Sequence, residues 1–308
     1  MKALRLSGSA ESPALIATEI PALKPERGEV AVRVYAAGVT PTEVIWYPTT
    51  HTKDGGPRTG AVPAHEFCGE ISAIGEGVSG WEVGREVYGM NDWFADGALA
   101  EYCITRPEWI APKPRSLSHA EAASVPIGVL TAWQGLLDRA HLRTGERVLI
   151  HGGAGAVGVY AIQLARRCET HVMTTVSSRD FEFVKELGAD EVIDYRAQRF
   201  EDGTREVDVV FDAVGGDTLR RSWGVLNRNG RLVTIAASSE ATRDEREKAA
   251  FFIVEPNREQ LTEIAGLLDA RELRAVVDRV VPFSQAADAY AGTVERRGRG
   301  KLVAAVAG

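Results

Sequence analysis

The sequence has 308 residues, 44% of them hydrophobic, which is enough for one large core or two domains. Its 36 Lys and Arg are outnumbered by 43 Asp and Glu, and no basic run with interleaved aromatics tracks nucleic-acid phosphates, so nucleic acid is excluded as a partner. With no signal-peptide-like apolar stretch, no 18-residue apolar run and only three scattered cysteines, the sequence predicts a cytoplasmic protein without a membrane segment or disulfides.

Up to about residue 112 the chain consists of short strand-like runs broken by glycine and proline, such as GEVAVRVYAAGV, FCGEISAIGEGV, REVYGM and ALAEYCIT. In the first of these runs, Val30, Val32 and Val34 alternate with more polar neighbours, which is the period of a strand with one buried face. This half is therefore predicted to be an antiparallel, barrel-like domain.

A change of pattern follows at residues 111–126, APKPRSLSHAEAASVP. Pro112 and Pro114 favour an extended link, and Ser118 with Glu121 three residues later forms a capping box that predicts a helix start. We place the domain boundary here.

Apolar runs and helical segments then alternate. The runs are RVLIHG, THVMTTV, DEVIDY, VDVVFDAV, RLVTIAA and FFIV. Such continuously apolar runs suit strands covered on both faces by helices, so six of them predict a doubly wound parallel sheet.

The remaining chain exceeds what a six-stranded nucleotide domain needs and is assigned to the first half. The predicted domains are therefore residues 1–117 with 255–308, and residues 118–254. The basic run RRGRG at 296–300 is interpreted as a solvated turn.

The most informative motif is a glycine loop in RVLIHGGAGAVGVYAIQLARRC. A strand ends at Ile150, the loop Gly153-x-Gly155-x-x-Gly158 follows, with Ala156 and Val157 inside it, and an amphipathic helix comes next. Strand, glycine turn and helix N-terminus together supply the close backbone and free N–H groups that a pyrophosphate needs. The loop is predicted to bind a dinucleotide.

The next strand ends at a position where an NAD-specific domain would carry Asp or Glu for the ribose hydroxyls. This chain has Ser177, Ser178 and Arg179 instead. Hydroxyls and a guanidinium suit a 2′-phosphate, which favours NADPH over NADH. The alternative is an exposed Arg179 that caps a helix, and Asp180 would repel a phosphate if it turned inward.

These motifs, together with AAGVTPTEV, PAHEFCGE, PIGVLTAWQGL, LGADEVIDY, VFDAVGG and GKLV, resemble the medium-chain dehydrogenase/reductase superfamily over nearly the whole chain. The closest match in pattern is its zinc-independent quinone oxidoreductase branch, related to zeta-crystallin. The resemblance implies a fold of class α/β: a GroES-like β-barrel-type catalytic domain beside a doubly wound Rossmann domain, with the active site in the cleft between them.

Zinc alcohol dehydrogenases of the superfamily hold catalytic zinc with two cysteines and a histidine. This chain resembles them in His65-Glu66, but Thr40 stands at the first cysteine position and PIGVLTAW lacks the second. One ligand of three does not make a stable site, and Cys68 lies three positions from His65 in an extended segment, so its side chain diverges from that of His65. No metal site is predicted.

Without a metal, the chemistry requires an acceptor that is already electrophilic, such as a quinone or conjugated carbonyl, and hydrogen-bond donors for the developing oxyanion. The candidate catalytic donors are Thr40, Tyr47 and His65, with Trp46 as a stacking wall. Tyr47 is equally compatible with a barrel-surface aromatic. Trp93 and Phe94 are candidates for an apolar pocket or for simple packing.

Further cofactor contacts are implied by the resemblance alone. They are Thr131 near the nicotinamide end, Tyr195 near the 2′-phosphate, Val214 by the adenosine ribose, and Ala236 and Phe252 near the nicotinamide. Each of these residues is also compatible with a place in the core, Phe252 most of all because it lies in an apolar run. The run FFIV is a candidate edge strand for a homodimer.

The predicted activity is NADPH-dependent reduction of a quinone or another conjugated carbonyl without a metal. Two alternatives remain open. One is an alkenal or enoyl double-bond reductase of the same superfamily, and the other is a non-catalytic NADPH-binding redox sensor.

Overall fold

The computed structural model describes residues 1–9, 12–236 and 242–306. The chain divides into two compact units. Unit 1 comprises Met1–Ile127, Pro256–Arg297 and Lys301–Gly308, and unit 2 comprises Gly128–Glu255 and Gly298–Gly300. The division at residue 127 falls after the predicted boundary at 117, because the helix that begins at His119 packs on two strands of unit 1. The three residues 298–300 of unit 2 lie in the segment interpreted as a solvated turn.

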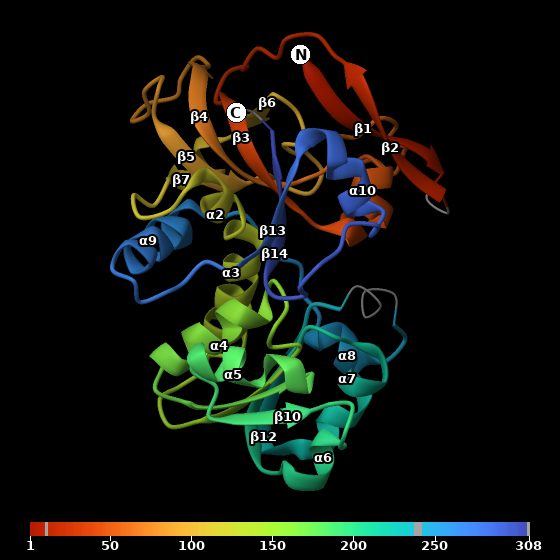
Figure 1. Ribbon diagram of the computed structural model, residues 1–308, viewed down its shortest axis with the longest axis vertical. Coiled ribbons are helices and arrows are strands. Elements are labelled where there is room, and N and C mark those ends of the chain that lie inside the picture. The colour runs from red at the N-terminus through yellow and green to blue at the C-terminus, as the bar shows by residue number, and fades with distance from the viewer. Residues whose placement is uncertain (10–11, 237–241, 307–308) are drawn as a thin grey trace. The chain divides into compact units, whose positions relative to one another are not determined.

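Unit 1 is built on a seven-stranded sheet with strand order β13-β14-β3-β4-β5-β7, with β6 paired to β3, and on a separate β1-β2 hairpin (Figure 1). All its pairs are antiparallel except β13 with β14. Its strands are β1 Lys2–Ser9, β2 Ser12–Glu19, β3 Val30–Val39, β4 Glu66–Ile74, β5 Glu86–Met90, β6 Tyr102–Thr105, β7 Ile110–Pro112, β13 Val277–Pro282 and β14 Lys301–Ala305.

The predicted alternation in β3 is confirmed in part: Val30, Val32 and Val34 are fully buried and Arg33 is exposed, but Ala31 is buried too. Burial of each valine contributes about 1.5–3 kcal/mol. The helices of this unit are α1 Tyr47–Thr50, α2 His119–Ala123, α9 Arg258–Asp269 and α10 Ala286–Tyr290, with short 3-10 turns at η1 Pro41–Ile45, η2 Pro107–Trp109 and η7 Phe283–Gln285. The Ser118–Glu121 capping box at the start of α2 is also confirmed.

Unit 2 contains a parallel sheet with strand order β10-β9-β8-β11-β12. Its strands are β8 Arg147–His151, β9 His171–Val176, β10 Glu191–Asp194, β11 Val207–Asp212 and β12 Leu226–Thr234. Its helices are α3 Pro126–Trp133, which starts in unit 1, the π-helix η3 Gln134–Arg139, α4 Gly158–Arg167, α5 Phe181–Glu186, α6 Phe200–Gly203, α7 Gly216–Ser222 and α8 Glu245–Ala250, with 3-10 turns at η4 Ser178–Asp180 and η5 Trp223–Val225.

The sixth strand predicted at residues 251–254 does not form. Phe251 makes one isolated bridge to Thr234, and the chain then leaves the sheet, where the Glu255 N–H donates to the side chain of Gln134. The prediction failed because a four-residue apolar run fits a buried loop as well as a strand. Phe252 is buried outside the sheet, and the Arg139 guanidinium lies over its ring. The candidate edge strand for a homodimer is therefore absent from residues 251–254.

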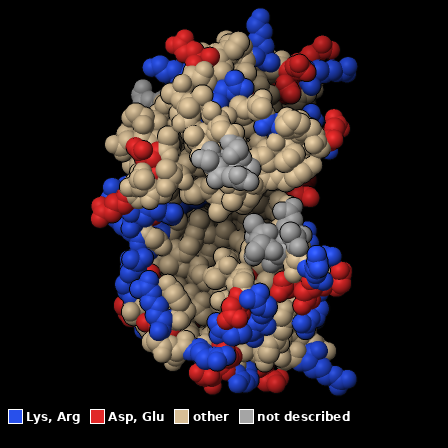
Figure 2. Space-filling view, turned by 90° about the vertical axis from the view of Figure 1, so that its right-hand side faces the viewer, with Lys and Arg blue, Asp and Glu red and all other residues tan. Residues whose placement is uncertain are grey.

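Acidic and basic side chains are interspersed on the face drawn in Figure 2. This mixture is consistent with the formal charge of -7 and with the absence of a basic nucleic-acid stripe from the sequence.

Among the residues that the structure describes, no helix has both the length and the apolar character needed to cross a bilayer.

Candidate functional site

The glycine loop of unit 2 connects β8 to α4. Gly152 has a φ of 82°, which favours glycine, and an added Cβ at Gly158 would overlap the Gly152 carbonyl oxygen. An added Cβ at Gly155 would instead find only the Gly152 oxygen, at 3.3 Å. The residue before α4, Val157, provides no side-chain cap for the first turn. The loop therefore presents backbone and free N–H groups of the kind that bind phosphate.

A cavity of about 610 Å³ opens beside this loop within unit 2, in the size range of small-molecule sites. It is lined by eight of the predicted cofactor residues: Gly155, Ala156, Val157, Gly158, Ser177, Arg179, Tyr195 and Val214. Tyr195 and Val214 are both exposed. The chain thus brings the loop, the end of β9, the end of β10 and the turn after β11 around one space, as parallel strands with a common carboxyl edge do.

Five other predicted cofactor residues do not line this cavity. Gly153 lies under the loop, where an added Cβ would overlap the Thr174 hydroxyl, and Ser178 is exposed in η4. Thr131 and Phe252 are buried in α3 and after α8, and the Ala236 N–H donates to the Thr234 hydroxyl. The proposed contacts of these residues with a cofactor stay predictions.

The end of β9 holds a charged cluster. Asp180 is buried and accepts hydrogen bonds from the Ser177 hydroxyl at 2.8 Å, Arg179 Nε at 3.3 Å and Arg299 Nε at 2.7 Å. Burial would raise the pKa of Asp180, but these hydrogen bonds, that of Arg299 first, hold it below its usual value. Asp180, which could have repelled a phosphate, is therefore ionised and paired with these donors. Most of the Arg179 side chain is exposed.

His151, at the end of β8, also lines the cavity and was not identified from the sequence. Its ring is buried between hydrogen bonds to Thr175 at 3.1 Å and Ser222 at 2.9 Å, with the edge of Phe200 beside it. Burial and the nearby charge of Arg221 lower the pKa of His151 to about 3. The ring is therefore neutral in the folded protein.

This burial predicts a pH dependence of stability. In the unfolded chain the histidine takes up a proton below about pH 6.5, whereas in the folded chain it does so only near pH 3, so stability falls as pH decreases between these values. Relative to the His151→Asn variant, the wild type should lose up to about 1.4 kcal/mol more per pH unit. Urea unfolding across the range from neutral pH to about pH 5 measures this, and parallel pH profiles for the two proteins would contradict it.

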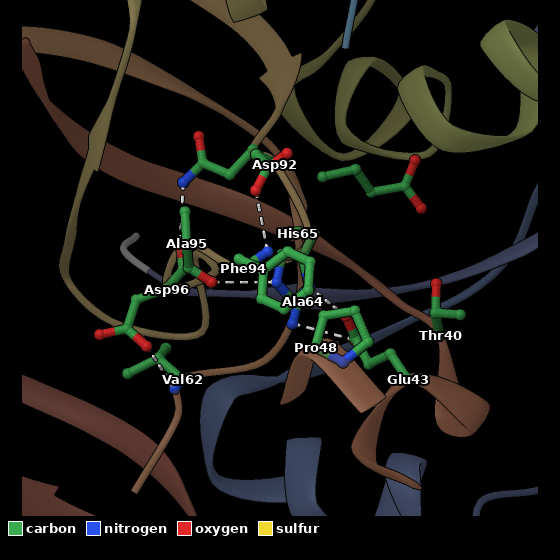
Figure 3. Close-up of polar contacts among 12 residues, drawn as sticks. Thr40, Glu43, Pro48, Val62, Ala64, His65, Asp92, Phe94, Ala95 and Asp96 are labelled. Carbon is green, nitrogen blue, oxygen red and sulfur yellow. Dashed lines mark hydrogen bonds and ion pairs between the residues drawn. The ribbon is translucent and has the colours of Figure 1, made fainter. Parts of the chain in front are cut away.

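Unit 1 contains a buried acid–base cluster around the motif HE at residues 65–66. His65 Nδ1 lies 2.5 Å from a carboxylate oxygen of Glu43, and His65 Nε2 lies 3.2 Å from the Ala95 carbonyl (Figure 3). The Tyr290 hydroxyl and the Ala64 N–H both donate to the other oxygen of Glu43. Both ring nitrogens of His65 thus face oxygen atoms of neighbouring groups.

The charge of Glu43 fits this arrangement. Burial would raise the pKa of Glu43, but the hydrogen bond and the charge of His65 lower it below its usual value. Glu43 is therefore a carboxylate that fixes His65. His65 is 1% exposed, so its ring is enclosed by these partners.

Glu66 forms a second buried pair. One of its oxygens lies 2.5 Å from Lys301 Nζ, and the other accepts the Ile127 N–H at 2.8 Å. Lys301 Nζ also donates to the Thr40 hydroxyl oxygen at 2.6 Å. Because a lysine ammonium cannot accept, the hydroxyl proton of Thr40 points to some other group. Thr40 is partly exposed, so this proton is available to a neighbouring molecule.

The aromatic candidates of unit 1 separate into two groups. Trp93 is buried, with its ring 4.8 Å from that of Trp46 and 4.9 Å from that of His65. Tyr47 is exposed and stacks on His51 at 4.4 Å. The Lys53 ammonium lies over the ring of Phe94 in a cation–π contact. Trp93 therefore packs against the polar cluster, and Tyr47 presents its ring to solvent.

Within the ranges that the structure describes, no group of three or more His, Cys, Asp or Glu is arranged to hold a metal ion. Thr40 stands beside Lys301 rather than beside a second potential ligand. Cys68 is buried, and its sulfur contacts His119 Nδ1 at 3.4 Å. Burial raises the pKa of this thiol well above its usual value, so it is not a thiolate.

A parallel sheet with a glycine loop at its carboxyl edge, joined to an antiparallel unit with a buried His–Glu motif, defines a dinucleotide-dependent dehydrogenase or reductase. Residues 26–115 match the family described as alcohol dehydrogenase GroES-like domain, and residues 187–303 match the family described as zinc-binding dehydrogenase. The chain belongs to the medium-chain dehydrogenase/reductase superfamily, and both the predicted family and the predicted fold class are confirmed.

Individual relatives cover most of the chain. The chain is 32% identical to 2-methylene-furan-3-one reductase of Solanum lycopersicum, over 89% of this chain and 71% of that one. It is 30% identical to the mitochondrial NAD(P)H oxidoreductase RTN4IP1 of Homo sapiens, over 89% of this chain and 81% of that one. The solved structure of a quinone oxidoreductase from Coxiella burnetii is 30% identical and superposes with a TM-score of 0.87, covering 100% of this chain and 99% of that one.

Sequence reasoning missed Tyr290, Lys301, His151 and Arg299. Lys301 left a visible signal, since a lysine that opens the apolar run KLVAAV would be buried with the strand. Tyr290 and Arg299 left none, because each meets its partner only through the fold.

Proposed function

We propose that the protein is an NADPH-dependent reductase of quinones or other conjugated carbonyl compounds that works without a resident metal. The observation that carries the proposal is the cavity beside the glycine loop, in which most of the Arg179 side chain is exposed and the adjacent Asp180 is already paired with Ser177 and Arg299. The names of two relatives, a quinone oxidoreductase and a furanone reductase, support this class of acceptor.

The residues of unit 2 would hold the cofactor. Gly155, Ala156 and Gly158 line the cavity with backbone that a pyrophosphate can approach, and the N-terminal end of the α4 dipole favours its negative charge. Arg179 would bind a 2′-phosphate, with Tyr195 beside it, and Ser177 would do so only by turning its hydroxyl away from Asp180. NADPH, when bound, supplies the hydride that reduces the acceptor.

The residues of unit 1 would act on the acceptor oxygen. Thr40 would donate its hydroxyl proton as a hydrogen bond, because Lys301 already occupies a lone pair of the same oxygen and polarises the O–H bond. Tyr47, which is exposed, would contact the acceptor ring. His65 would position its surroundings rather than touch the substrate, since both its nitrogens are engaged.

The absence of a metal from the proposal rests on the ligand set. Of the three positions that hold zinc in the metal-dependent branch, this chain retains only His65, and the nitrogens of His65 are directed at Glu43 and Ala95. The cytoplasmic location and the homodimer stay predictions.

The test is an assay of turnover by chelator-treated protein, in which the decrease in NADPH absorbance is monitored. We expect consumption of NADPH with 1,4-benzoquinone, 9,10-phenanthrenequinone or a short 2-alkenal, and a preference among them identifies quinone or alkene reduction. Thr40→Val should lower kcat on the order of 100-fold, and Thr40→Ser should retain most of it. Tight NADPH binding without turnover of any acceptor would instead favour a redox sensor, and activity that returns only with zinc would overturn the metal-free proposal.

The assignment of Arg179 yields a separate prediction. Arg179→Ala should weaken NADPH binding by about 1–3 kcal/mol and leave NADH binding nearly unchanged, because the lost contact is charge-assisted and specific for the 2′-phosphate. Titration of each cofactor against the protein's fluorescence measures both affinities. Arg228→Ala is the matched control, since Arg228 is exposed and does not line the cavity. Equal losses for both cofactors would mean that Arg179 does not touch the phosphate.

A further inference from the structure

The basic run 296–300 is not a free turn. The Gly300 N–H donates to the Ala154 carbonyl at 2.9 Å, and Gly300 bridges to Gly155, so the segment is bonded directly to the glycine loop. Gly298 lines the cavity with a φ of 82°, and an added Cβ there would lie 2.7 Å from Arg179 Nη2. Gly298 of residues 298–300, here called the tail segment, therefore lines the cavity, and Gly300 fixes the segment to the glycine loop.

Arg299, the middle residue of the tail segment, is held on three sides by residues 179–183. Its Nε lies 2.7 Å from Asp180 Oδ1, its Nη2 donates to the Arg179 carbonyl at 2.8 Å, and its guanidinium lies over the Phe183 ring at 4.8 Å. A guanidinium bonded to a carboxylate and a carbonyl while stacked on an aromatic ring has few alternative positions. The arginine is thus placed to act on Asp180.

Asp180 is the residue on which cofactor choice depends. It lines the cavity three positions after Ser177 at the end of β9. An unpaired carboxylate in this region is what NAD-specific domains use to bind the ribose hydroxyls, and it would repel a 2′-phosphate. Among Arg179, Asp180 and Arg299, two positive charges face one negative charge, which leaves a net positive charge at this end of the cavity.

We propose that Arg299 is a specificity-determining residue, which masks the Asp180 carboxylate and so makes the cavity accept a 2′-phosphorylated dinucleotide. The proposal rests on the proposed function and names the residue that sets its cofactor preference. Arg299 acts through Asp180 and does not need to touch the phosphate. Its consequence is that Asp180 and Arg299 are energetically coupled in NADPH binding and uncoupled in NADH binding.

The test compares wild type, Arg299→Ala, Asp180→Asn and the double variant by fluorescence titration with NADPH and NADH, and with 2′,5′-ADP and 5′-AMP, which carry only the adenosine end. No acceptor is present, so the result does not depend on turnover. Arg299→Ala should weaken NADPH and 2′,5′-ADP binding about tenfold without weakening NADH or 5′-AMP binding. The double variant should bind NADPH within about threefold of Asp180→Asn alone, because the unmasked carboxylate is gone.

Other outcomes overturn the proposal in distinct ways. A double variant as weak as Arg299→Ala would mean that Arg299 contacts the phosphate itself. Equal losses for NADPH and NADH would mean that Arg299 only anchors the loop. Arg297→Ala, an exposed arginine of the same run, is the control for nonspecific charge and should change neither affinity. If wild type shows no preference for NADPH, the cofactor assignment of the proposed function fails as well, and that is visible before any variant is measured.

Discussion

Lys301→Met is expected to lower the free energy of unfolding by about 3–5 kcal/mol, because it leaves the Glu66 carboxylate buried without its cation. Glu66 is fully buried, and its remaining protein donor is the Ile127 N–H. Methionine fills nearly the volume of the lysine side chain, so the loss reports charge rather than a cavity. Urea unfolding at constant pH measures the effect.

The loss should depend on pH. Burial raises the pKa of Glu66 even with Lys301 beside it, and removal of the lysine charge raises it further. A carboxyl group whose folded-state pKa is raised loses stability as the pH rises through that pKa, so the deficit of the variant is largest near pH 8 and shrinks toward pH 5. A deficit independent of pH would indicate lost packing instead.

Two further proteins isolate the charge effect. The double variant Lys301→Met with Glu66→Gln should recover much of the stability, since no unpaired charge remains in the core. Lys185→Met removes an exposed pair with Glu182 and should cost at most about 1 kcal/mol. A double variant no more stable than Lys301→Met would show that the pair is not the reason for the loss.

Substitutions in the glycine loop are expected to separate folding from cofactor binding. Gly155→Ala should leave the unfolding midpoint nearly unchanged and weaken NADPH binding on the order of 100-fold. The reason is that an added Cβ at Gly155 meets only the Gly152 oxygen, at 3.3 Å, which a shift of a few tenths of an ångström relieves, while Gly155 lines the cavity where a pyrophosphate would approach.

Gly158→Ala should instead lower both stability and binding. Its Cβ would overlap the backbone of Gly152 and Gly153, which cannot yield without moving the loop, and overpacking of this kind costs about 1–3 kcal/mol. Thermal unfolding and cofactor titration on the same samples give the two numbers. A Gly155→Ala protein that binds NADPH as tightly as wild type would place the pyrophosphate elsewhere.

The parts of the fold that were predictable from sequence are those in which local chemistry and tertiary structure agree. The alternation of Val30, Val32 and Val34, the capping box at Ser118 and the loop between β8 and α4 are local patterns with a direct physical cause. The run 251–254 failed because a short apolar segment carries no information on whether its backbone pairs with a neighbour. Within the residues that the structure describes, the parallel sheet of unit 2 consequently has five strands instead of the six predicted.

The candidate site was predictable only in part, for a related reason. His65, Glu66 and Thr40 stood out from the sequence. Lys301, which pairs with Glu66 and Thr40, and Tyr290, which binds the Glu43 that holds His65, lie more than 200 positions away from the residues they contact. The sequence indicated that Asp180 would repel a phosphate if it turned inward. Its neutralising partner Arg299 could not be foreseen, because it lies in a glycine-rich basic run that is typical of a surface turn. Charge pairing across such separations follows from topology and cannot be derived from residue type.

Unit 2 consists of two separate segments of the chain, residues 128–255 and 298–300, and this affects the order in which it is completed during translation. During synthesis, residues 128–255 are complete before residues 256–297 of unit 1 have been added, and only then do residues 298–300 become available. Nascent chains halted between these points would carry the five-stranded sheet without Gly298 of the cavity lining and without Arg299, the partner of Asp180. The ability to retain NADPH should therefore emerge late in translation, after the nucleotide-binding sheet can already form.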